Sequence, residues 1–181
     1  MTKEEFETFL EQRGQATREA KLIDWESRKR DWLLRLGGFY STIEGYLAHY
    51  KNSGKLKVDR SKVPLTEEHI GTYQADAMDI SIGSDKVTLA PIGTLLIGAR
   101  GRVDMTGPAG TVKFVLTGRH SNGIRISVPT AGENPPAREA SPQPSTPEEF
   151  MWKIATPPPK IRFIELGAET FFSALTEVVN G

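Results

Sequence analysis

Hydrophobic and polar residues alternate through the middle of the chain. In residues 94–105 the odd positions are apolar or glycine, whereas Arg100, Arg102 and Asp104 stand at even positions. Successive side chains of a strand point to opposite faces of a sheet, so this pattern predicts a strand with a dry face and a wet face.

The alternation recurs in residues 112–117 and 124–128. Turn sequences separate the three segments, with glycine and proline in residues 107–110 and Asn-Gly in residues 121–123. Short links of this kind join antiparallel neighbours, so we expect a three-stranded meander.

Further strands are predicted on both sides of this meander. Pro91 and Gly93 are expected to end one of them, and the three prolines of residues 157–159 predict an extended linker. Residues 55–62 are polar and basic, which predicts a loop or an edge of the sheet. The expected strands are residues 73–82, 86–89, 150–154 and 161–164.

Apolar residues recur at helical spacing near both ends of the chain. We expect a helical region over residues 3–35, a break at Gly37 and Gly38, and a second helix over residues 39–50. The residues 66–69 resemble the start of a short helix, because a threonine precedes two acids. A last helix is expected over residues 168–179.

These elements predict the α+β class. The expected fold has N-terminal helices, an antiparallel sheet of about six to seven strands and one C-terminal helix. A strongly curved sheet or partial barrel, bent at Gly98 and Gly101, is the alternative; the same glycines would also suit close packing of a helix, which we favour.

The chain divides into residues 1–52, a helical region, and residues 53–181, a sheet domain with the C-terminal helix. We expect the two to form one compact unit. Residues 129–149 contain six prolines and no large apolar residue, which predicts a flexible loop that is either a lid or merely disordered.

Composition excludes several classes of chemistry. The chain has no cysteine, which rules out disulfides, thiolate metal sites and a cysteine nucleophile. No apolar run approaches the roughly 20 residues of a membrane span, and we expect a cytoplasmic protein that makes no membrane contact. Basic and acidic residues balance at 23 each, so any charge effect must be local.

One such local excess exists in residues 86–128, with six basic residues and one acid. We expect most of these charges to share the wet face of the sheet. A solvated face paired with neighbouring acids is the favoured interpretation, and a groove for an anionic ligand or nucleic acid is the alternative. The candidate ligand-binding residues are Arg100, Arg102, Asp104, Lys113, Arg119 and Arg125.

No motif specifies catalysis, a cofactor or a metal. The three histidines lack metal-ligand spacing, and neither a P-loop nor a G-x-S-x-G sequence is present. Asp76, Asp79 and Asp104 are the candidate acids for acid–base chemistry. Asp79 and Asp104 could meet across neighbouring strands or pair with Arg100 or Arg102, and the ion pair is the favoured interpretation.

Three functional hypotheses follow. The leading one is a non-catalytic binding or interaction module that self-associates through apolar patches at residues 6–10 and 22–36. The second is a binder of an anionic ligand or nucleic acid through the basic sheet face. The third is an enzyme whose site lies between the wet face and the Pro-rich loop, with Asp79 or Asp104 as acid or base.

Overall fold

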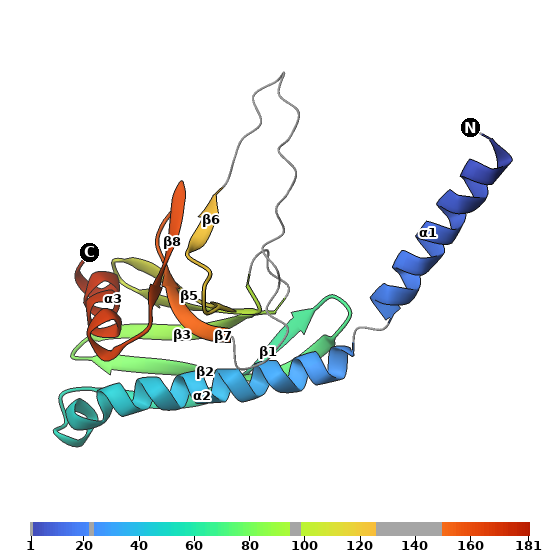
Figure 1. Cartoon of the computed structure of the whole chain (residues 1–181). Helices are drawn as coiled ribbons and strands as arrows, with labels where there is room; N and C mark the ends of the chain where they lie inside the picture. Colours follow the sequence, from blue (N-terminus) through green and yellow to red (C-terminus); the bar gives the residue numbers. More distant parts are fainter. Residues whose placement is uncertain (1, 22–23, 95–98, 126–149) are drawn as a thin grey trace.

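The computed structural model describes residues 2–21, 24–94, 99–125 and 150–181 of the 181-residue chain. Within these residues, three helices and an open antiparallel sheet form the α+β fold that the sequence predicts (Figure 1). In chain order the elements are α1 (Lys3–Lys21), α2 (Trp25–Asn52), β1 (Lys57–Glu67), β2 (Gly71–Ile82), β3 (Asp85–Gly93), β4 (Gly101–Gly107), β5 (Gly110–Gly118), β6 (Gly123–Arg125), β7 (Phe150–Ala155), β8 (Lys160–Glu165) and α3 (Ala168–Asn180).

The sheet begins as a simple run of hairpins and then departs from it. Strands β1 to β5 are antiparallel neighbours in chain order, β7 adds beside β5, and β8 adds beside β7. Strand β6 pairs with the first half of β8 and not with β5, so the predicted meander is wrong in its third strand. The six residues of β7 bring Trp152 and Ile154 to the core, which the three-residue β6 cannot do.

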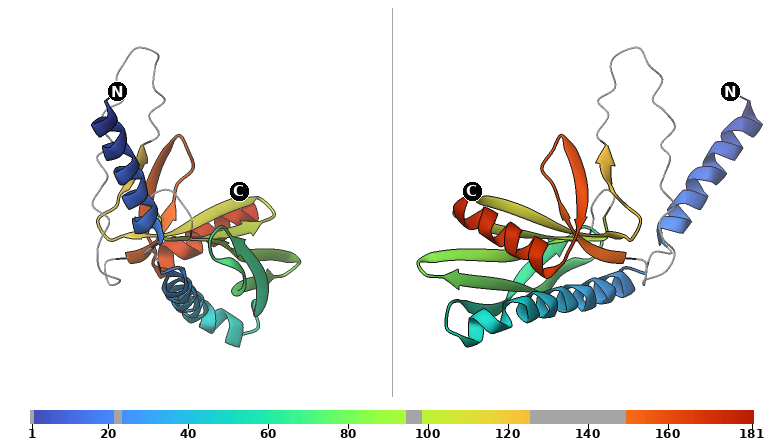
Figure 2. Two further views of the ribbon diagram at one scale, coloured as in Figure 1. Left: turned by 90° about the vertical axis from the view of Figure 1, so that its right-hand side faces the viewer. Right: turned by 60° about the vertical axis from the view of Figure 1, so that its left-hand side comes forward.

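Helices α2 and α3 cover the same face of the sheet (Figures 1 and 2). This core face carries Val103, Met105 and Phe114, which are completely buried, and Phe171 of α3 contacts the Phe114 ring. Burial of apolar area is the main force that joins the helices to the sheet. The opposite face, with Arg102 and Asp104, is the wet face, and neither of these helices covers it.

Helix α2 is one helix of 28 residues, so the predicted break at Gly37 and Gly38 is wrong. It begins at the N-cap Asp24, whose carboxylate accepts a hydrogen bond from the Ser27 amide (3.0 Å). The helix continues through both glycines because its apolar stripe, which packs on the sheet, extends on both sides of them. The side chains on that stripe are at most 1% exposed: Trp32, Leu36, Phe39, Tyr40, Ile43 and Leu47.

The predicted helix start at residues 66–69 is also wrong, because these residues end β1 and turn into β2. Strand β1 forms an edge of the sheet, in agreement with the basic residues at its start. His69 adopts a positive φ of 69° and Gly71 one of 85°, which suit the turn of a hairpin and not a helix.

Two proline-containing segments depart from expectation. Strand β3 continues through Pro91 to Gly93, with a register shift between these residues against β4. The three prolines of residues 157–159 do not form an extended linker but connect β7 to β8 in a hairpin, where the Thr156 amide donates to Arg162 O (2.9 Å). The expected lid or loop of residues 129–149 lies outside the described residues, as does Gly98.

Gly101 is a close-packing position at the start of β4. A Cβ atom built on Gly101 would lie 2.2 Å from Cζ3 of Trp32, because the indole ring of α2 rests directly on the strand. This confirms packing, and not a bend in the sheet, as the role of this glycine. The remaining predicted strands and the last helix are confirmed as β2, β7, β8 and α3.

Candidate functional site

On the wet face of β4, the positive charge of Arg102 is neutralised by Asp104 of the same strand. Arg102 donates two hydrogen bonds to the Asp104 carboxylate, Nε to Oδ1 and Nη2 to Oδ2, both of 2.6 Å. This bidentate contact raises the pKa of Arg102 above its ordinary value. Lys113 of β5 is the cross-strand neighbour of Asp104 in the register of the sheet. The face therefore has the mixed charge of a solvated sheet surface.

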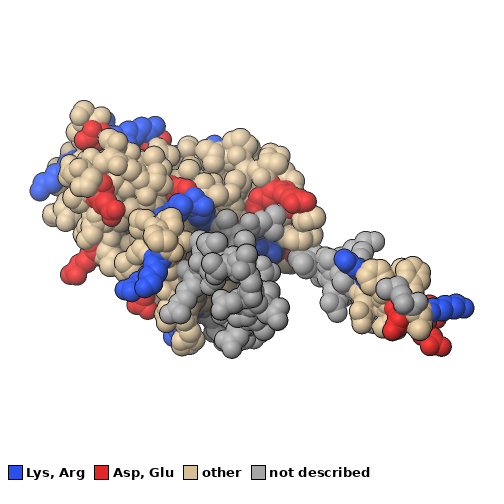
Figure 3. Space-filling view, turned by 90° about the horizontal axis from the view of Figure 1, so that it is seen from above, with Lys and Arg blue, Asp and Glu red and all other residues tan. Residues whose placement is uncertain are grey.

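Figure 3 shows acidic and basic side chains interspersed over the described atoms of the face that it draws. Asp79 of β2 also has partners of its own, accepting from Thr88 Oγ1 (2.7 Å) and pairing with Lys86 (3.0 Å). Partial burial acts to raise the pKa of Asp79, but these two contacts outweigh it and hold the pKa below its ordinary value. Asp79 and Asp104 do not meet, because β3 lies between their strands.

The structure separates the other predicted site residues. Arg119 is exposed in the turn after β5, and Arg125 lies in β6, paired in register with Lys160. Lys153 of β7, which sequence analysis did not single out, is only 3% exposed and is the buried cation of this region. Its Nζ donates to the carbonyl oxygens of Gly118, Arg119 and Ser121, at 3.3, 2.7 and 2.7 Å.

Desolvation lowers the pKa of Lys153, and the nearby charge of Glu165 acts in the opposite direction. All three of its donors are engaged by one turn of the chain, so Lys153 stabilises the turn and is unavailable to a ligand. The sequence signal was present, since Lys153 interrupts an apolar strand, but burial could not be inferred without the strand order.

Arg100 does not share the wet face with Arg102. It lies in a bend before β4, and its guanidinium is 4.7 Å from the centre of the Phe150 ring. Phe150 has the same facing as Trp152 two residues later, and Trp152 packs on Phe39 of α2. Arg100 therefore lies on the side of the sheet that the helices cover, and no described residue forms an ion pair with it.

A groove lies next to Arg100, between the middle of α2 and β7, and we call it the α2–β7 groove. Its volume is about 270 Å³. Arg35 of α2 lies 5.7 Å from the Phe150 ring, so two guanidinium groups flank one aromatic side chain. The groove is lined chiefly by Arg35, Gly38, Thr42, Leu116, Phe150 and Trp152.

A polar cluster joins the β1–β2 hairpin to the start of α2. The buried carboxylate of Glu67 accepts from Thr94 N (2.6 Å), from Thr94 Oγ1 (2.9 Å) and from the Tyr73 hydroxyl. Arg28 Nη2 donates to Thr94 O (2.9 Å). Desolvation chiefly lowers the pKa of Arg28; the charge of Arg100 lowers it further, whereas Glu67 acts to raise it. The internal hydrogen bonds indicate that Glu67 fixes the hairpin.

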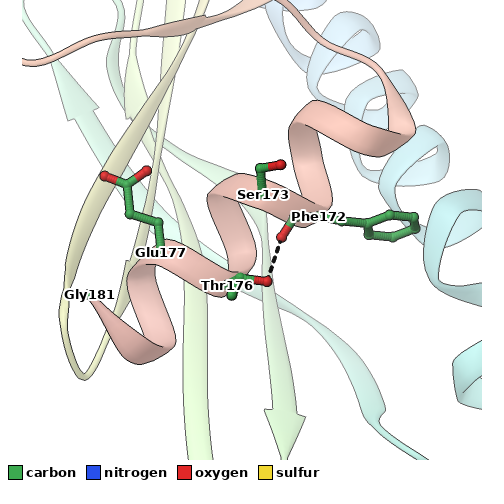
Figure 4. Close-up of a pocket in the computed structure, with 5 residues that line it drawn as sticks. All are labelled: Phe172, Ser173, Thr176, Glu177 and Gly181. Atoms are coloured by element: carbon green, nitrogen blue, oxygen red, sulfur yellow. Dashed lines mark hydrogen bonds between the residues drawn. The ribbon is translucent and has the colours of Figure 1, made fainter.

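A surface depression of about 510 Å³ runs along α3 (Figure 4). Its lining comes from α3 and the C-cap Gly181 alone, and Thr176 Oγ1 donates back to Phe172 O (2.9 Å). Glu177 is the single charged side chain in the lining, so no second element converges on this depression to form a binding site.

Chemistry-bearing clusters are scarce in the described part of the chain. Within it, no group of three or more His, Asp or Glu side chains could hold a metal ion. His69 stacks on Trp25 at 5.1 Å between ring centres, which is a packing contact at the hairpin turn. None of the described helices is long and apolar enough to cross a bilayer.

Helix α1 presents the clearest unpartnered surface. Phe6, Phe9 and Leu10 form one stripe and are 48%, 44% and 51% exposed. Figure 1 shows α1 standing apart from the sheet and from the other two helices. Its start is well defined, because the Thr2 amide donates to Glu5 Oε2 (2.6 Å) and the Glu5 amide donates to Thr2 Oγ1 (3.2 Å).

Comparison of the chain with protein-family models, with curated proteins and with solved structures gave no match.

Proposed function

We propose that this protein is a non-catalytic interaction module that self-associates through α1. The observation that carries the proposal is the stripe of Phe6, Phe9 and Leu10, whose large apolar side chains are about half exposed on a helix that stands apart from the body. Most helical stability in proteins comes from packing an apolar face, and α1 packs on no other described element in this structure. A partner helix or surface would supply that burial.

Charge along α1 favours a second copy of the chain as the partner. Residues 4–12 contain four glutamates and no basic residue, whereas residues 13–21 contain three basic residues and one acid. A helix with opposite charge at its two ends meets complementary charge in another copy of itself or in basic surface elsewhere on that copy.

Sedimentation equilibrium of the full chain over a range of concentrations tests the proposal. We expect a concentration-dependent dimer, and we expect the variant Phe6→Ser/Phe9→Ser to be monomeric. Leu34→Ser is the matched control, because Leu34 is an isolated apolar side chain on α2 that is 76% exposed. A wild-type chain that stays monomeric up to about 1 mM, beyond the range of specific association, would contradict self-association.

The second hypothesis, binding of an anion or nucleic acid on the wet face, has weaker support. Asp104 already engages Arg102, and of the predicted binding residues Lys113 and Arg119 are exposed. If such binding occurs, affinity should fall steeply with salt and should weaken in Lys113→Ala/Arg119→Ala. The enzyme hypothesis has the weakest support, because Asp79 and Asp104 are each engaged by neighbouring side chains of the sheet face.

A further inference from the structure

We propose that α1 of one copy docks in the α2–β7 groove of a second copy, with its acidic N-terminal half facing Arg100. The inference rests on the proposed self-association and names the surface that receives the helix. A two-fold exchange of this kind places each α1 on the body of the other copy, so the assembly closes as a dimer.

The size of the α2–β7 groove matches one aromatic side chain. A cavity of roughly 150 Å³ accepts benzene, whereas drug-sized ligands need roughly 300 Å³ or more. At about 270 Å³ the groove is sized for a phenyl ring with part of its backbone. Gly38 leaves one wall open, since a Cβ atom there would meet nothing within 4 Å. Phe6 or Phe9 of an incoming helix would fill this space.

The charge of the groove calls for an acidic occupant. Arg100 lies over Phe150 and has no acidic partner among the described residues. Arg28 lies close enough to Arg100 for the charge of Arg100 to help lower the pKa of Arg28, and an anion beside two neighbouring cations offsets their repulsion. Arg35, whose guanidinium also lies near the Phe150 ring, is paired with Asp31 (2.9 Å), which holds it in place.

Helix α1 has the complementary chemistry. Its residues 4–11 are Glu-Glu-Phe-Glu-Thr-Phe-Leu-Glu, in which aromatic and acidic side chains alternate in groups. Glu7 and Glu11 lie one turn apart and about 100° around the helix from Phe6 and Leu10 respectively. When the apolar stripe of α1 faces the groove, these carboxylates lie beside the stripe. The Arg100 guanidinium can then form hydrogen bonds with them.

The occupant is a second copy and not the same chain, because Figure 1 shows α1 extending away from the body, beyond the start of α2. The groove of the same chain lies beside the middle of α2, where its lining includes Gly38 and Thr42. A second copy can bring its own α1 to the groove without any change in the fold of either body.

A groove-filling substitution tests the docking site without weakening the fold. Gly38→Leu improves helix propensity and places a side chain in the groove, so we expect dissociation at concentrations at least about tenfold higher than for wild type. Gly45→Leu is the matched control, in the same helix and with the same open space around its Cβ, but outside the groove. It should associate like wild type.

A second experiment exchanges the charges of the groove and of α1. Arg100→Glu and Glu7→Lys/Glu11→Lys should each weaken self-association, because each places like charges across the contact. An equimolar mixture of the two variants should recover it, since every α1 then meets a groove of opposite charge. In Arg100→Glu the new carboxylate lies near Arg28 of its own chain, so we expect the fold to persist.

The outcomes separate the two proposals. Loss of association in Gly38→Leu with recovery in the charge-exchange mixture supports docking in the groove. Full dimerisation of both Gly38→Leu and Arg100→Glu would overturn the docking site while leaving self-association intact, with pairing of α1 to α1 as the remaining geometry. A monomeric wild-type chain would overturn both proposals. All species are measured by sedimentation equilibrium on the full chain at equal ionic strength.

Discussion

Helices α1 and α2 follow one another in the chain and differ in what holds them in place. Helix α1 has a capping box at Thr2 and Glu5, one glycine and no proline, yet its largest apolar side chains are about half exposed. Helix α2 contains three glycines, two of them adjacent, and still runs unbroken for 28 residues with its apolar stripe buried.

The comparison shows that burial outweighs local preference in this fold. Glycine costs about 0.5–1 kcal/mol in a helix interior, whereas full burial of one large apolar side chain contributes about 1.5–3 kcal/mol. Six such side chains line α2, so the sheet holds the helix through its glycines. Helix α1 has the better local signals and no such support, which is why we assign it to contacts between molecules.

The largest effect should come from truncating matched aromatics in the two helices. Trp32→Ala leaves a large cavity between α2 and β4, and we expect a loss of about 3–5 kcal/mol in the free energy of unfolding. Phe9→Ala should change that free energy by less than about 0.5 kcal/mol while weakening self-association. Urea unfolding at low protein concentration measures the first quantity. Equal losses for both variants would show that α1 packs on its own body in solution.

A smaller effect is expected where α2 rests on the sheet. In Gly101→Ala the new methyl group would overlap the Trp32 ring, so we expect destabilisation of about 1–3 kcal/mol. Gly110→Ala is the control, because a Cβ there meets nothing within 4 Å. If thermal unfolding finds the same midpoint for both variants and wild type, the close contact between the Trp32 ring of α2 and Gly101 of β4 is incorrect.

Alkaline pH should weaken the hairpin that supports the start of α2. Burial first, and the hydrogen bond to Glu67 second, raise the pKa of Tyr73 above its ordinary value of 10.0. Because the native state holds this proton more tightly than the unfolded chain, the stabilisation is complete below pH 10.0 and declines as pH rises above it.

Tyr73 is only half-buried, so solvent screening limits its contribution to about 1 kcal/mol or less near about pH 11. The slope of unfolding free energy against pH, measured by urea titration above pH 10.0, should be shallower in Tyr73→Phe than in wild type. An unchanged slope would remove Tyr73 from the alkaline response. Tyr40, whose pKa is also raised by burial, should contribute a similar slope that Tyr40→Phe reduces.

The class of fold and most strands follow from periodicity alone, because alternation in β2, β4 and β5 reports a face that is buried in the structure. What failed depends on contacts distant in sequence. The partner of β5 is chosen between β6 and β7 by how much each buries, and residues near Thr66 carry helix-start signals that pairing with β2 overrides. Neither the partner of β5 nor the strand near Thr66 can be predicted from a short stretch of sequence.

The candidate site shows the same limit. Arg102 and Asp104 are two positions apart on one face, so their ion pair was foreseeable from alternation. Arg100 continues that alternation in sequence but lies in a bend, which turns it to the other side of the sheet beside Phe150. The pairing of an arginine with an aromatic residue 50 positions away requires the order of the strands.

Gly37 allows the smallest and sharpest test of the comparison. A kink there, as the sequence predicts, would require a backbone that alanine disfavours, and Gly37→Ala would destabilise the protein. In the structure Gly37 is helical, its φ is not positive, and a Cβ meets nothing within 4 Å. We therefore expect Gly37→Ala to raise the free energy of unfolding by about 0.5–1 kcal/mol, as urea unfolding would measure. Because Gly37 does not line the α2–β7 groove, self-association should be unchanged, and a gain in stability with altered association would mean that the two helices are coupled through the body.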